Sequence, residues 1–418
     1  MARVLLLAYA CDRDDVSETW CSYQWASHLI ARHDATVVAY NRRDRFGAAR
    51  EQLRGARVIE WCEPAALGAA RTFSDMVKPG YLDYYRRARR LLRRLLREEA
   101  FDVIHQFEPF APRYPSPAAG LGVPFILGPV GGAVDTPPGF RAEVGESMRW
   151  YTKLRGLDRW RFRHDPWLRH TYASADLVLG IAPYVRELLD GVPLRGFACM
   201  HETGVERLPP ARPRRPGAPG TLRLLYVGRL VRTKGVRDLV RALAQLADLP
   251  EVRLDVVGDG DDRVACEAEA RALGLGERVR FHGWQDRAAV EGHYAAADVF
   301  AFPSFREASG QVIVEAMSHG LALVVADAGG PGWTVGDRCG IAVPPEEPRQ
   351  FAAGLATAIR RLAAAPALVE RYGRAARERV AADLLWSRKV ERMSALYTAV
   401  ASGGLVAPAG RAPRSAVQ

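Results

Sequence analysis

The chain shows the same pattern twice: short apolar segments alternate with longer segments of helical periodicity. In the first half, the apolar segments that indicate strands lie near 3–9, 35–40, 56–60, 101–107, 123–128 and 176–181. The pattern begins again at 222–228 and continues near 252–257, 277–281, 297–302, 322–326 and 339–343. Strands that alternate with helices form parallel sheets covered on both faces. The chain is therefore predicted to be an α/β protein with two doubly wound, Rossmann-like domains.

A proline-rich, basic segment at 209–220 marks the division between the halves and indicates a linker or surface loop. We expect an N-terminal domain at 1–205 and a second domain at 206–385. A final helix at 386–402 follows, and residues 403–418, rich in Gly, Ala and Pro, are predicted to be a disordered tail.

The sequence contains no run of about 18 apolar residues, so no membrane-spanning helix is predicted. An acidic stretch directly follows the apolar N-terminus, which favours a first strand over a signal peptide. The six cysteines are far apart and include no C-x-x-C pair, which argues against a zinc site or a disulfide framework and for a reducing cytoplasm.

The net charge of +11 is carried almost entirely by arginine. A bias of this kind is weak evidence for a nucleic-acid or membrane partner, and no nucleic-acid partner is predicted. It does make each lysine worth inspection, and the chain has four: Lys78, Lys153, Lys234 and Lys389.

Two glutamates, Glu307 and Glu315, carry the most informative polar pattern, with seven residues between them. Glu307 follows a buried strand, and Glu315 lies within a helix predicted at 309–319. Open α/β sheets bind ligands at the carboxyl ends of their strands. The helix start at Ser309-Gly310-Gln311 offers free backbone N–H groups to an anion. Read alone, the pair fits a ligand site and an ordinary structural role equally well. In the structural role, Glu307 caps the helix and Glu315 is a solvated helix residue.

A second pattern, Gly228-Arg229-Leu230-Val231-Arg232-Thr233-Lys234-Gly235, follows the first strand of the second half. A strand end, a glycine and cations that precede a helix suit a diphosphate, which needs backbone N–H groups and positive side chains. The alternative is an exposed loop with ordinary surface charges.

Together these segments resemble the family 4 glycosyltransferases, retaining sugar-nucleotide enzymes of GT-B fold with two Rossmann-like domains that face each other across a cleft. The resemblance includes the Pro-Ser before Glu307, the Ser-Gly between the glutamates and the Glu-Ala-Met at Glu315. It implies that Glu307 contacts the donor sugar and Glu315 the ribose. It also implies that Arg229 and Lys234 bind the diphosphate, and that the last helix returns to the first domain.

The resemblance also places the nucleotide base at the end of strand 277–281, against the backbone of His282 and Gly283. The segment Gly258-Asp259-Gly260-Asp261-Asp262 could pass for a metal-binding D-x-D. The family has a glycine turn at this place and uses no metal, so a capped turn is the preferred interpretation.

The first half resembles the family weakly. Gly131 and Gly132 follow strand 123–128 and would let a substrate approach the backbone, but the histidine that many members carry there is missing. His105 is either a core histidine or an acceptor-side residue. The loop at 11–20, usually glycine-rich in the family, carries four carboxylates: Asp12, Asp14, Asp15 and Glu18. It is either a solvated loop or a site that attracts a cationic acceptor.

Two basic stretches remain open. The helix predicted at 84–97 has Leu91, Leu92, Leu95 and Leu96 on one face and arginines on the other, which suits either core packing or an anionic membrane. Residues 149–170 mix Trp150, Tyr151, Trp160, Phe162 and Trp167 with arginines. They could form an acceptor wall, a membrane contact or two ordinary helices.

The sequence thus predicts a retaining, metal-independent glycosyltransferase that moves a sugar from a nucleotide diphosphate sugar, with UDP or GDP as the nucleotide, to an acceptor hydroxyl. No cofactor is expected. The acceptor is either an amino sugar or aminocyclitol, or a lipid-linked or polysaccharide acceptor at a membrane surface. A sugar-nucleotide epimerase of GT-B fold is the alternative from another class. The expected location is cytoplasmic with possible peripheral membrane contact, and the oligomeric state is left open.

Overall fold

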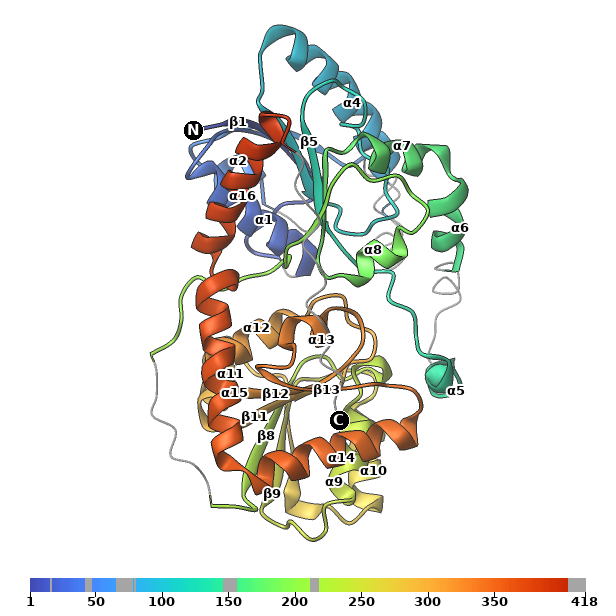
Figure 1. Ribbon diagram of the computed structural model, residues 1–418, viewed down its shortest axis with the longest axis vertical. Helices are drawn as coiled ribbons and strands as arrows, with labels where there is room; N and C mark the ends of the chain where they lie inside the picture. The colour runs from blue at the N-terminus through green and yellow to red at the C-terminus, as the bar shows by residue number, and fades with distance from the viewer. Residues whose placement is uncertain are drawn as a thin grey trace. The chain divides into compact units, whose positions relative to one another are not determined.

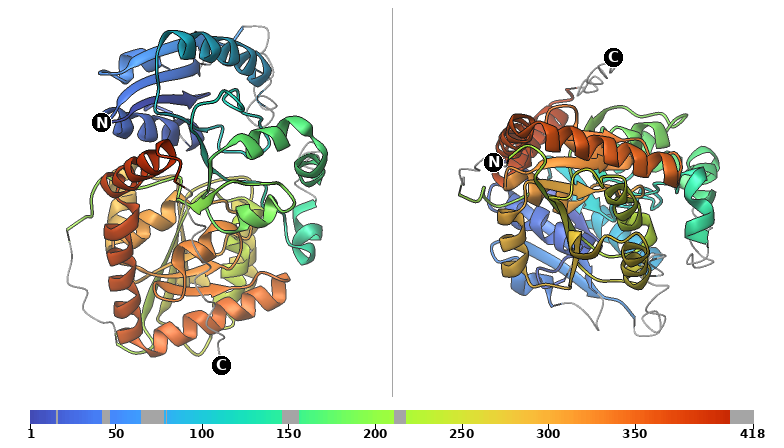
Figure 2. Two further views of the ribbon diagram at one scale, coloured as in Figure 1. Left: turned by 45° about the horizontal axis from the view of Figure 1, so that its top comes forward. Right: turned by 90° about the horizontal axis from the view of Figure 1, so that it is seen from below.

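The computed structural model describes residues 1–15, 17–41, 47–64, 78, 80–145, 156–210 and 218–404. Trp150, Tyr151, most of the linker predicted at 209–220 and nearly all of the predicted tail lie outside the described residues. The chain divides into two compact units. Unit 1 comprises Met1–Ala133, Lys153–Glu202 and Lys389–Gln418, and unit 2 comprises Val134–Thr152 and Thr203–Arg388. Each unit contains one sheet flanked by helices (Figure 1, Figure 2).

Unit 1 contains a parallel sheet of seven strands in the order β3-β2-β1-β4-β5-β6-β7. The strands are β1 (Arg3–Ala8), β2 (Asp34–Asn41), β3 (Arg57–Cys62), β4 (Val103–Glu108), β5 (Phe125–Val130), β6 (Leu177–Gly180) and β7 (Phe197–Cys199). The helices of this unit are α1 (Ser17–Ile30), α2 (Ala49–Gln52), α4 (Tyr81–Glu98), α6 (Gly156–His164), α7 (Pro166–Ser174), α8 (Tyr184–Leu188) and most of α16 (Trp386–Ala401). Among the described strands of unit 1, the edge strand β7, three residues long, is the one that was not predicted.

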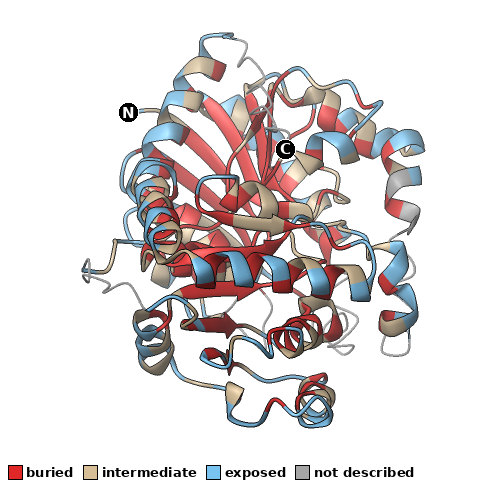
Figure 3. Ribbon diagram, turned by 60° about the horizontal axis from the view of Figure 1, so that its bottom comes forward, coloured by how far each residue is buried: buried red, intermediate tan, exposed pale blue. Residues whose placement is uncertain are grey.

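The central strands of unit 1 are buried because helices cover both faces of the sheet. Every residue of β4 and β5 is buried, and the strands stand out as buried in Figure 3. The helix predicted at 84–97 is α4, which buries Leu91, Leu92 and Leu95. The leucine face therefore belongs to the core of unit 1, which agrees with the core-packing interpretation of this helix.

Unit 2 contains a parallel sheet of six strands in the order β10-β9-β8-β11-β12-β13. The strands are β8 (Leu222–Val227), β9 (Val252–Val257), β10 (Val279–Gly283), β11 (Val299–Phe302), β12 (Ala322–Ala326) and β13 (Gly340–Val343). The main helices are α9 (Val236–Ala244), α10 (Arg263–Ala272), α11 (Arg287–Ala296), α12 (Gln311–Ser318), α13 (Gly329–Val335), α14 (Pro348–Ala364) and α15 (Pro366–Arg379).

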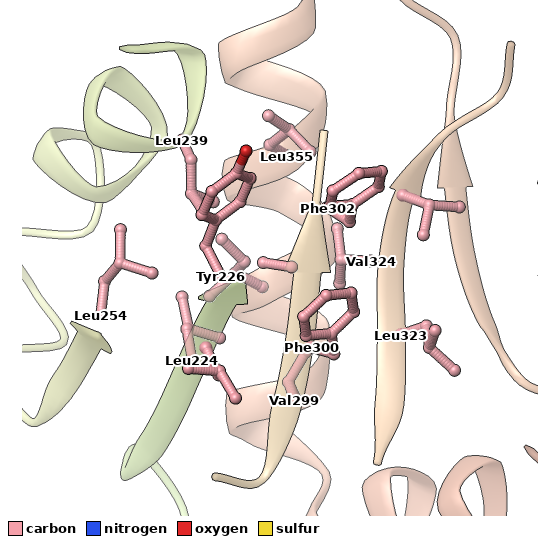
Figure 4. Packing of buried hydrophobic residues seen from close by; sticks show 14 of the residues in the cluster. Leu224, Tyr226, Leu239, Leu254, Val299, Phe300, Phe302, Leu323, Val324 and Leu355 are labelled. Carbon is pink, nitrogen blue, oxygen red and sulfur yellow. The ribbon is translucent and has the colours of Figure 1, made fainter. Parts of the chain in front are cut away.

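The core of unit 2 joins the middle of its sheet to the helices on either side. Tyr226 of β8 and Phe302 of β11 stack with ring centres 5.8 Å apart, and Leu239 of α9 and Leu355 of α14 pack nearby (Figure 4). The rigid packing of β8 against β11 fixes the two strand ends from which the candidate site is built.

One segment packs where the sequence did not place it. Residues 134–145 precede strands β6 and β7 of unit 1, yet their short helices η2 (Pro138–Phe140) and α5 (Arg141–Gly145) belong to unit 2. Phe140 is fully buried there, with its ring centre 4.2 Å from that of Phe305. The alternation of strands and helices gives the order of elements but does not tell which sheet a connection packs on. Residues 134–145, which we call the excursion, therefore could not be assigned to unit 2 from the sequence pattern.

Among the described residues no single helix is long and apolar enough to cross a membrane. The pair Pro348–Ala364 and Pro366–Leu384 passes on length and composition when taken together, but it is bent by 103° at the break. All six cysteines are free thiols.

Candidate donor-binding site

The sheet of unit 2 grows in two directions from its centre. From β8 the chain adds β9 and β10 on one side and then returns to add β11, β12 and β13 on the other. At such a switch point the loops after the two central strands diverge, which leaves room for a ligand at their carboxyl ends. Gly228 and Arg229 follow β8, and Pro303 to Glu307 follow β11. Both predicted donor motifs therefore lie at this switch point.

A glycine brings the two loops into contact. Gly235 has φ of 76°, and a Cβ at this position would lie 2.1 Å from the carbonyl oxygen of Pro303. Only glycine tolerates both the left-handed backbone and this close approach. The turn η4 (Arg232–Lys234) is thereby held directly against the loop that carries Glu307.

Lys234 and Glu307 form an ion pair. Their side chains are only 17% and 16% exposed, and the Lys234 Nζ lies 5.4 Å from the centre of the Phe302 ring. Arg229 differs, because it is exposed and forms no ion pair with any described residue. The structure thus joins one predicted phosphate-binding cation to the predicted sugar-binding carboxylate and leaves the second cation open.

Glu315 lies on α12, which begins at Gln311 rather than at the predicted Ser309 because Gly310 adopts φ of 84°. Burial raises the pKa of Glu315. The Tyr294 hydroxyl donates to one carboxylate oxygen at 3.1 Å, and Gln311 Nε2 donates to the other at 3.3 Å. Sequence reasoning missed Tyr294, because a tyrosine on a separate helix carries no motif. Ser309 is buried beside the helix start.

The predicted base-binding segment ends β10. His282 Nε2 lies 2.6 Å from an Asp255 carboxylate oxygen, and the Gly283 carbonyl accepts from the Gly258 N–H at 2.8 Å. Both groups already have partners within unit 2. Contact of this segment with a nucleotide base remains a prediction.

The carboxylates of the glycine-rich turn after β9 are paired with arginines. Asp259 accepts from the Gly260 N–H at 2.8 Å and from Arg263 at 2.8 Å, and Asp262 forms an ion pair with Arg237. The turn is therefore held by ion pairs with arginines. The predicted helix cap is corrected, because the Asp262 side chain accepts no hydrogen bond from a backbone N–H in the first turn of α10 and pairs with Arg237 instead.

Two family models match the chain. The model described as "Glycosyl transferase 4-like domain" matches residues 19–196, and the model described as "Glycosyl transferases group 1" matches residues 212–379. The chain belongs to the family 4 type of glycosyltransferase. The matches together extend over most of both halves, which confirms the family to which the sequence motifs pointed.

Individual relatives match shorter stretches of this glycosyltransferase. "Glycogen synthase" of Mycobacterium tuberculosis is 34% identical over 196 residues, which is 46% of this chain and 46% of that protein. "Lipopolysaccharide core biosynthesis glycosyltransferase LpsE" of Rhizobium meliloti is 39% identical over 114 residues, 27% of this chain and 32% of that protein. The chain thus spans about half the length, or less, of the curated relatives it matches.

Among solved structures, sucrose-phosphate synthase from Thermosynechococcus elongatus superimposes with a TM-score of 0.66 at 20% identity, and the match covers 97% of this chain and 100% of that one. This likeness shows the fold and confirms the GT-B prediction.

The acidic loop of the glycosyltransferase follows β1 at the switch point of the unit 1 sheet, between β1 and β4. Asp12 is buried and accepts from the Asp14 N–H and from Gln52 Nε2, both at 2.8 Å. Glu18 pairs with Lys78 at 3.0 Å. The loop therefore exposes fewer free carboxylates than the sequence suggested, because Asp12 hydrogen-bonds within the fold and Glu18 is paired with a lysine.

Lys78 was singled out in the sequence only as one of four lysines. Besides Glu18 it contacts Glu108, which is fully buried at the end of β4, at 2.5 Å. Burial raises the pKa of Glu108, and the two carboxylates outweigh burial to raise the pKa of Lys78. The ammonium group thus compensates a carboxylate that would otherwise be costly to bury.

His105 is a core residue, and the acceptor-side interpretation is corrected. It is fully buried, and its Nδ1 and Nε2 lie 2.7 Å from the Tyr397 hydroxyl and 2.6 Å from the Gly128 carbonyl oxygen. Burial lowers its pKa to about 4. Both ring nitrogens have partners inside unit 1, so none is left for a substrate.

The two predicted glycines after β5 serve the fold locally. A Cβ at Gly131 would lie 2.0 Å from Ile181 Cδ1, and its N–H donates to the Phe110 carbonyl at 2.8 Å. Gly132 has φ of 100°, and its N–H donates to the Tyr184 hydroxyl at 2.9 Å. Packing alone accounts for glycine at the first position, and backbone conformation accounts for it at the second.

The core assignment of His105 predicts a pH dependence of stability. Its folded pKa, about 4, lies below the ordinary value of 6.5. The contribution of the neutral His105 ring to the free energy of unfolding is therefore fully present above about pH 6.5 and is lost as the pH falls towards 4. The expected loss is about 3 kcal/mol, from about 1.4 kcal/mol per pKa unit. Urea unfolding at several pH values should show a shallower dependence for His105→Gln than for the wild type. Equal dependence in both proteins would contradict the assignment.

Proposed function

We propose that this protein transfers a sugar from a nucleotide diphosphate sugar to an acceptor hydroxyl, with retention of configuration and without a metal. The observation that carries the proposal is the Lys234–Glu307 pair beside the exposed Arg229 at the switch point of unit 2. A cation poised against a carboxylate, with a second open cation and a helix start nearby, suits a ligand that has both phosphates and sugar hydroxyls.

The diphosphate would bind Arg229, Lys234 and the backbone N–H groups at the start of α12. These groups would stabilise the negative charge that develops on the leaving diphosphate. In the free protein the Glu307 carboxylate forms an ion pair with the Lys234 ammonium. A bound phosphate would compete for that ammonium and release Glu307 to accept hydrogen bonds from the donor sugar.

Glu315 would hold the ribose hydroxyls. Each carboxylate oxygen has two acceptor positions, and Tyr294 and Gln311 each use one. The remaining positions can accept from the two hydroxyls of a ribose. The contact from Tyr294 also fixes the direction in which the carboxylate points.

No side chain in the described donor site is placed as an evident nucleophile towards the sugar. We therefore propose transfer on the face from which the diphosphate leaves. The bond from the anomeric carbon to the diphosphate oxygen breaks as the bond to the acceptor oxygen forms, and the acceptor proton passes to a phosphate oxygen. The acceptor thus takes the face that the diphosphate leaves, and the configuration is retained.

The proposal is tested by donor binding and by product stereochemistry. Thermal unfolding should be measured against a panel of UDP and GDP sugars, because a ligand at 100 times its Kd adds about 2.7 kcal/mol of stability. The anomeric configuration of the product, determined by NMR, should match that of the donor. An inverted product would reject the mechanism, and conversion of the donor sugar without an acceptor would indicate the epimerase instead.

Metal independence gives a separate prediction. Arg229 and Lys234 supply the charge that a divalent cation would bring, and Asp259 and Asp262 are already paired with arginines. Initial rates measured before and after dialysis against EDTA should therefore be equal. A rate that falls with EDTA and returns with magnesium or manganese would contradict the prediction.

Two acceptor classes are supported by different surfaces of unit 1. A cationic amino sugar or aminocyclitol would be drawn by Asp14 and Asp15, the loop carboxylates that are not tied into the fold as Asp12 and Glu18 are. The Asp14 side chain is 70% exposed and pairs with Arg13 at 3.3 Å. Opposite charge favours the encounter and orientation of such a molecule.

A lipid-linked acceptor is favoured by what we call the α4–α7 surface. It comprises the exposed side chains Leu82, Arg86, Arg90, Arg93 and Arg97 of α4, Trp160 of α6 and Trp167 of α7. The ring of Trp167 lies 5.4 Å from that of Tyr85, which joins α7 to α4. Exposed tryptophans beside arginines suit the interface of an anionic membrane.

The two acceptor classes lead to opposite results. For a cationic acceptor, Asp14→Asn combined with Asp15→Asn should raise the acceptor KM, more at low than at high salt, and leave the donor KM unchanged. The charge-preserving pair Asp14→Glu and Asp15→Glu is the control. For a lipid-linked acceptor, those variants should behave as wild type. Trp167→Ala should then lower activity on acceptors in phosphatidylglycerol vesicles.

A further inference from the structure

The excursion 134–145 contacts the surroundings of the β11–α12 loop at several points. Near its start, a Cβ on Gly329 would lie 3.3 Å from Val134 and 2.1 Å from the carbonyl oxygen of Glu307. Asp135 acts electrostatically on Arg306, the residue before Glu307. Further on, the Phe140 and Phe305 ring centres lie 4.2 Å apart. The segment therefore packs beside the loop that carries the predicted sugar-binding carboxylate.

The end of the excursion holds the other donor loop. Arg232 is 4% exposed and binds Asp238 through two contacts of 2.6 and 3.0 Å. Its Nε also donates to Glu143 at 2.7 Å. The guanidinium carbon lies 5.4 Å from the ring centre of Phe140 and 5.3 Å from that of Phe305. One buried cation thus touches the excursion, α9 and the β11–α12 loop.

Two of these residues, Arg232 and Phe305, are close in sequence to the functional side chains, and we call them the anchors. Arg232 stands two residues before Lys234, and Phe305 stands two residues before Glu307. The excursion contacts both anchors, through Glu143 and Phe140. A displacement of either anchor would move the ammonium or the carboxylate that follows it, and small misplacements in a binding site carry large losses.

We propose that Phe140 and Glu143 are positioning residues for the donor site, although they lie in the half of the sequence that otherwise builds unit 1. They act through Arg232 and Phe305 and hold Lys234 and Glu307 at the spacing that a diphosphate sugar requires. This inference rests on the proposed function, since it assumes that Lys234 binds the diphosphate. It adds a determinant of donor affinity outside the sequence motifs.

The chain offers a matched control within the same charge network. Arg241 pairs with Glu143 at 3.1 Å and with Glu269 at 2.5 Å. Among the described residues, Glu269 forms no ion pair with Arg232 or with the β11–α12 loop. Glu143→Gln and Glu269→Gln each remove one carboxylate charge with little change of shape. The loss of thermal stability should therefore be similar in the two variants. Displacement of the donor loops, and with it a loss of nucleotide affinity, should occur only in Glu143→Gln.

The test measures UDP and GDP affinity by calorimetry, together with thermal unfolding of the free protein. We expect Glu143→Gln and Phe140→Leu to weaken binding of the recognised nucleotide about tenfold, and Glu269→Gln to leave it unchanged. Equal affinity in all three variants and the wild type would overturn the positioning role. Lys234→Ala separates the two proposals: if it weakens binding while Glu143→Gln does not, only the positioning role fails. If Lys234→Ala also leaves binding unchanged, the donor site itself is misassigned.

Discussion

Glu307→Gln should lower turnover on the order of a hundredfold, the size of effect expected when a reacting group is misplaced in an active site. Affinity for the free nucleoside diphosphate should stay the same or increase. The reason lies in the ion pair with Lys234: a diphosphate must displace the Glu307 carboxylate from the ammonium, and glutamine competes less strongly because it is neutral. Steady-state kinetics and calorimetry with the nucleoside diphosphate measure the two effects.

Glu315→Gln is the matched comparison, because it makes the same chemical change on α12. Glu315 is assigned to the ribose, which is present in both the donor and the free diphosphate. Its replacement should therefore weaken nucleoside diphosphate binding and raise the donor KM, with a smaller effect on turnover. If Glu307→Gln retained wild-type turnover, or if the two variants showed the same pattern, the separate roles of the glutamates would be wrong.

The relative placement of the candidate donor residues could be predicted because they lie in two short segments, each directly after a strand. The carboxyl ends of parallel strands lie at one edge of a sheet, so the predicted strands and their parallel arrangement were enough to place Arg229 and Glu307 on that edge. The contact between Lys234 and Glu307 needed the structure, because it depends on the close approach of Gly235 to Pro303.

The lysines show how a compositional bias can carry structural information. In a chain dominated by arginine, the three described lysines all hold specific partners: Lys78 pairs with Glu108, Lys234 with Glu307, and Lys389 donates to the His201 carbonyl. Each side chain is mostly buried. A compact ammonium fits such places where the planar guanidinium fork would not.

The first half was harder to interpret, for physical reasons. His105 lies within the strand predicted at 101–107, but only the packing of α16 shows that Tyr397 hydrogen-bonds its ring. Likewise, the loop carboxylates Asp12 and Glu18 look free until Gln52 and Lys78 are placed beside them. These partners lie far away in the sequence, and a pattern of periodicity contains no information about such pairs.

Lys234→Ala should weaken binding of the nucleoside diphosphate by about 1.5–3 kcal/mol, the usual contribution of a hydrogen bond to a charged group, which corresponds to roughly ten- to a hundredfold in affinity. Turnover should fall as well, because the same ammonium would stabilise the leaving diphosphate. Calorimetry and single-turnover kinetics measure these effects. Unchanged diphosphate affinity would place Lys234 outside the donor site.

The same substitution should destabilise the free protein, since it leaves the largely buried Glu307 carboxylate without its partner. This separates the structural from the functional effect of Lys234. The double variant Lys234→Met with Glu307→Gln removes both charges and should recover much of the lost thermal stability. It should recover neither diphosphate affinity nor turnover. Recovery of binding together with stability would mean that Lys234 supports the fold of the loop and does not bind the donor.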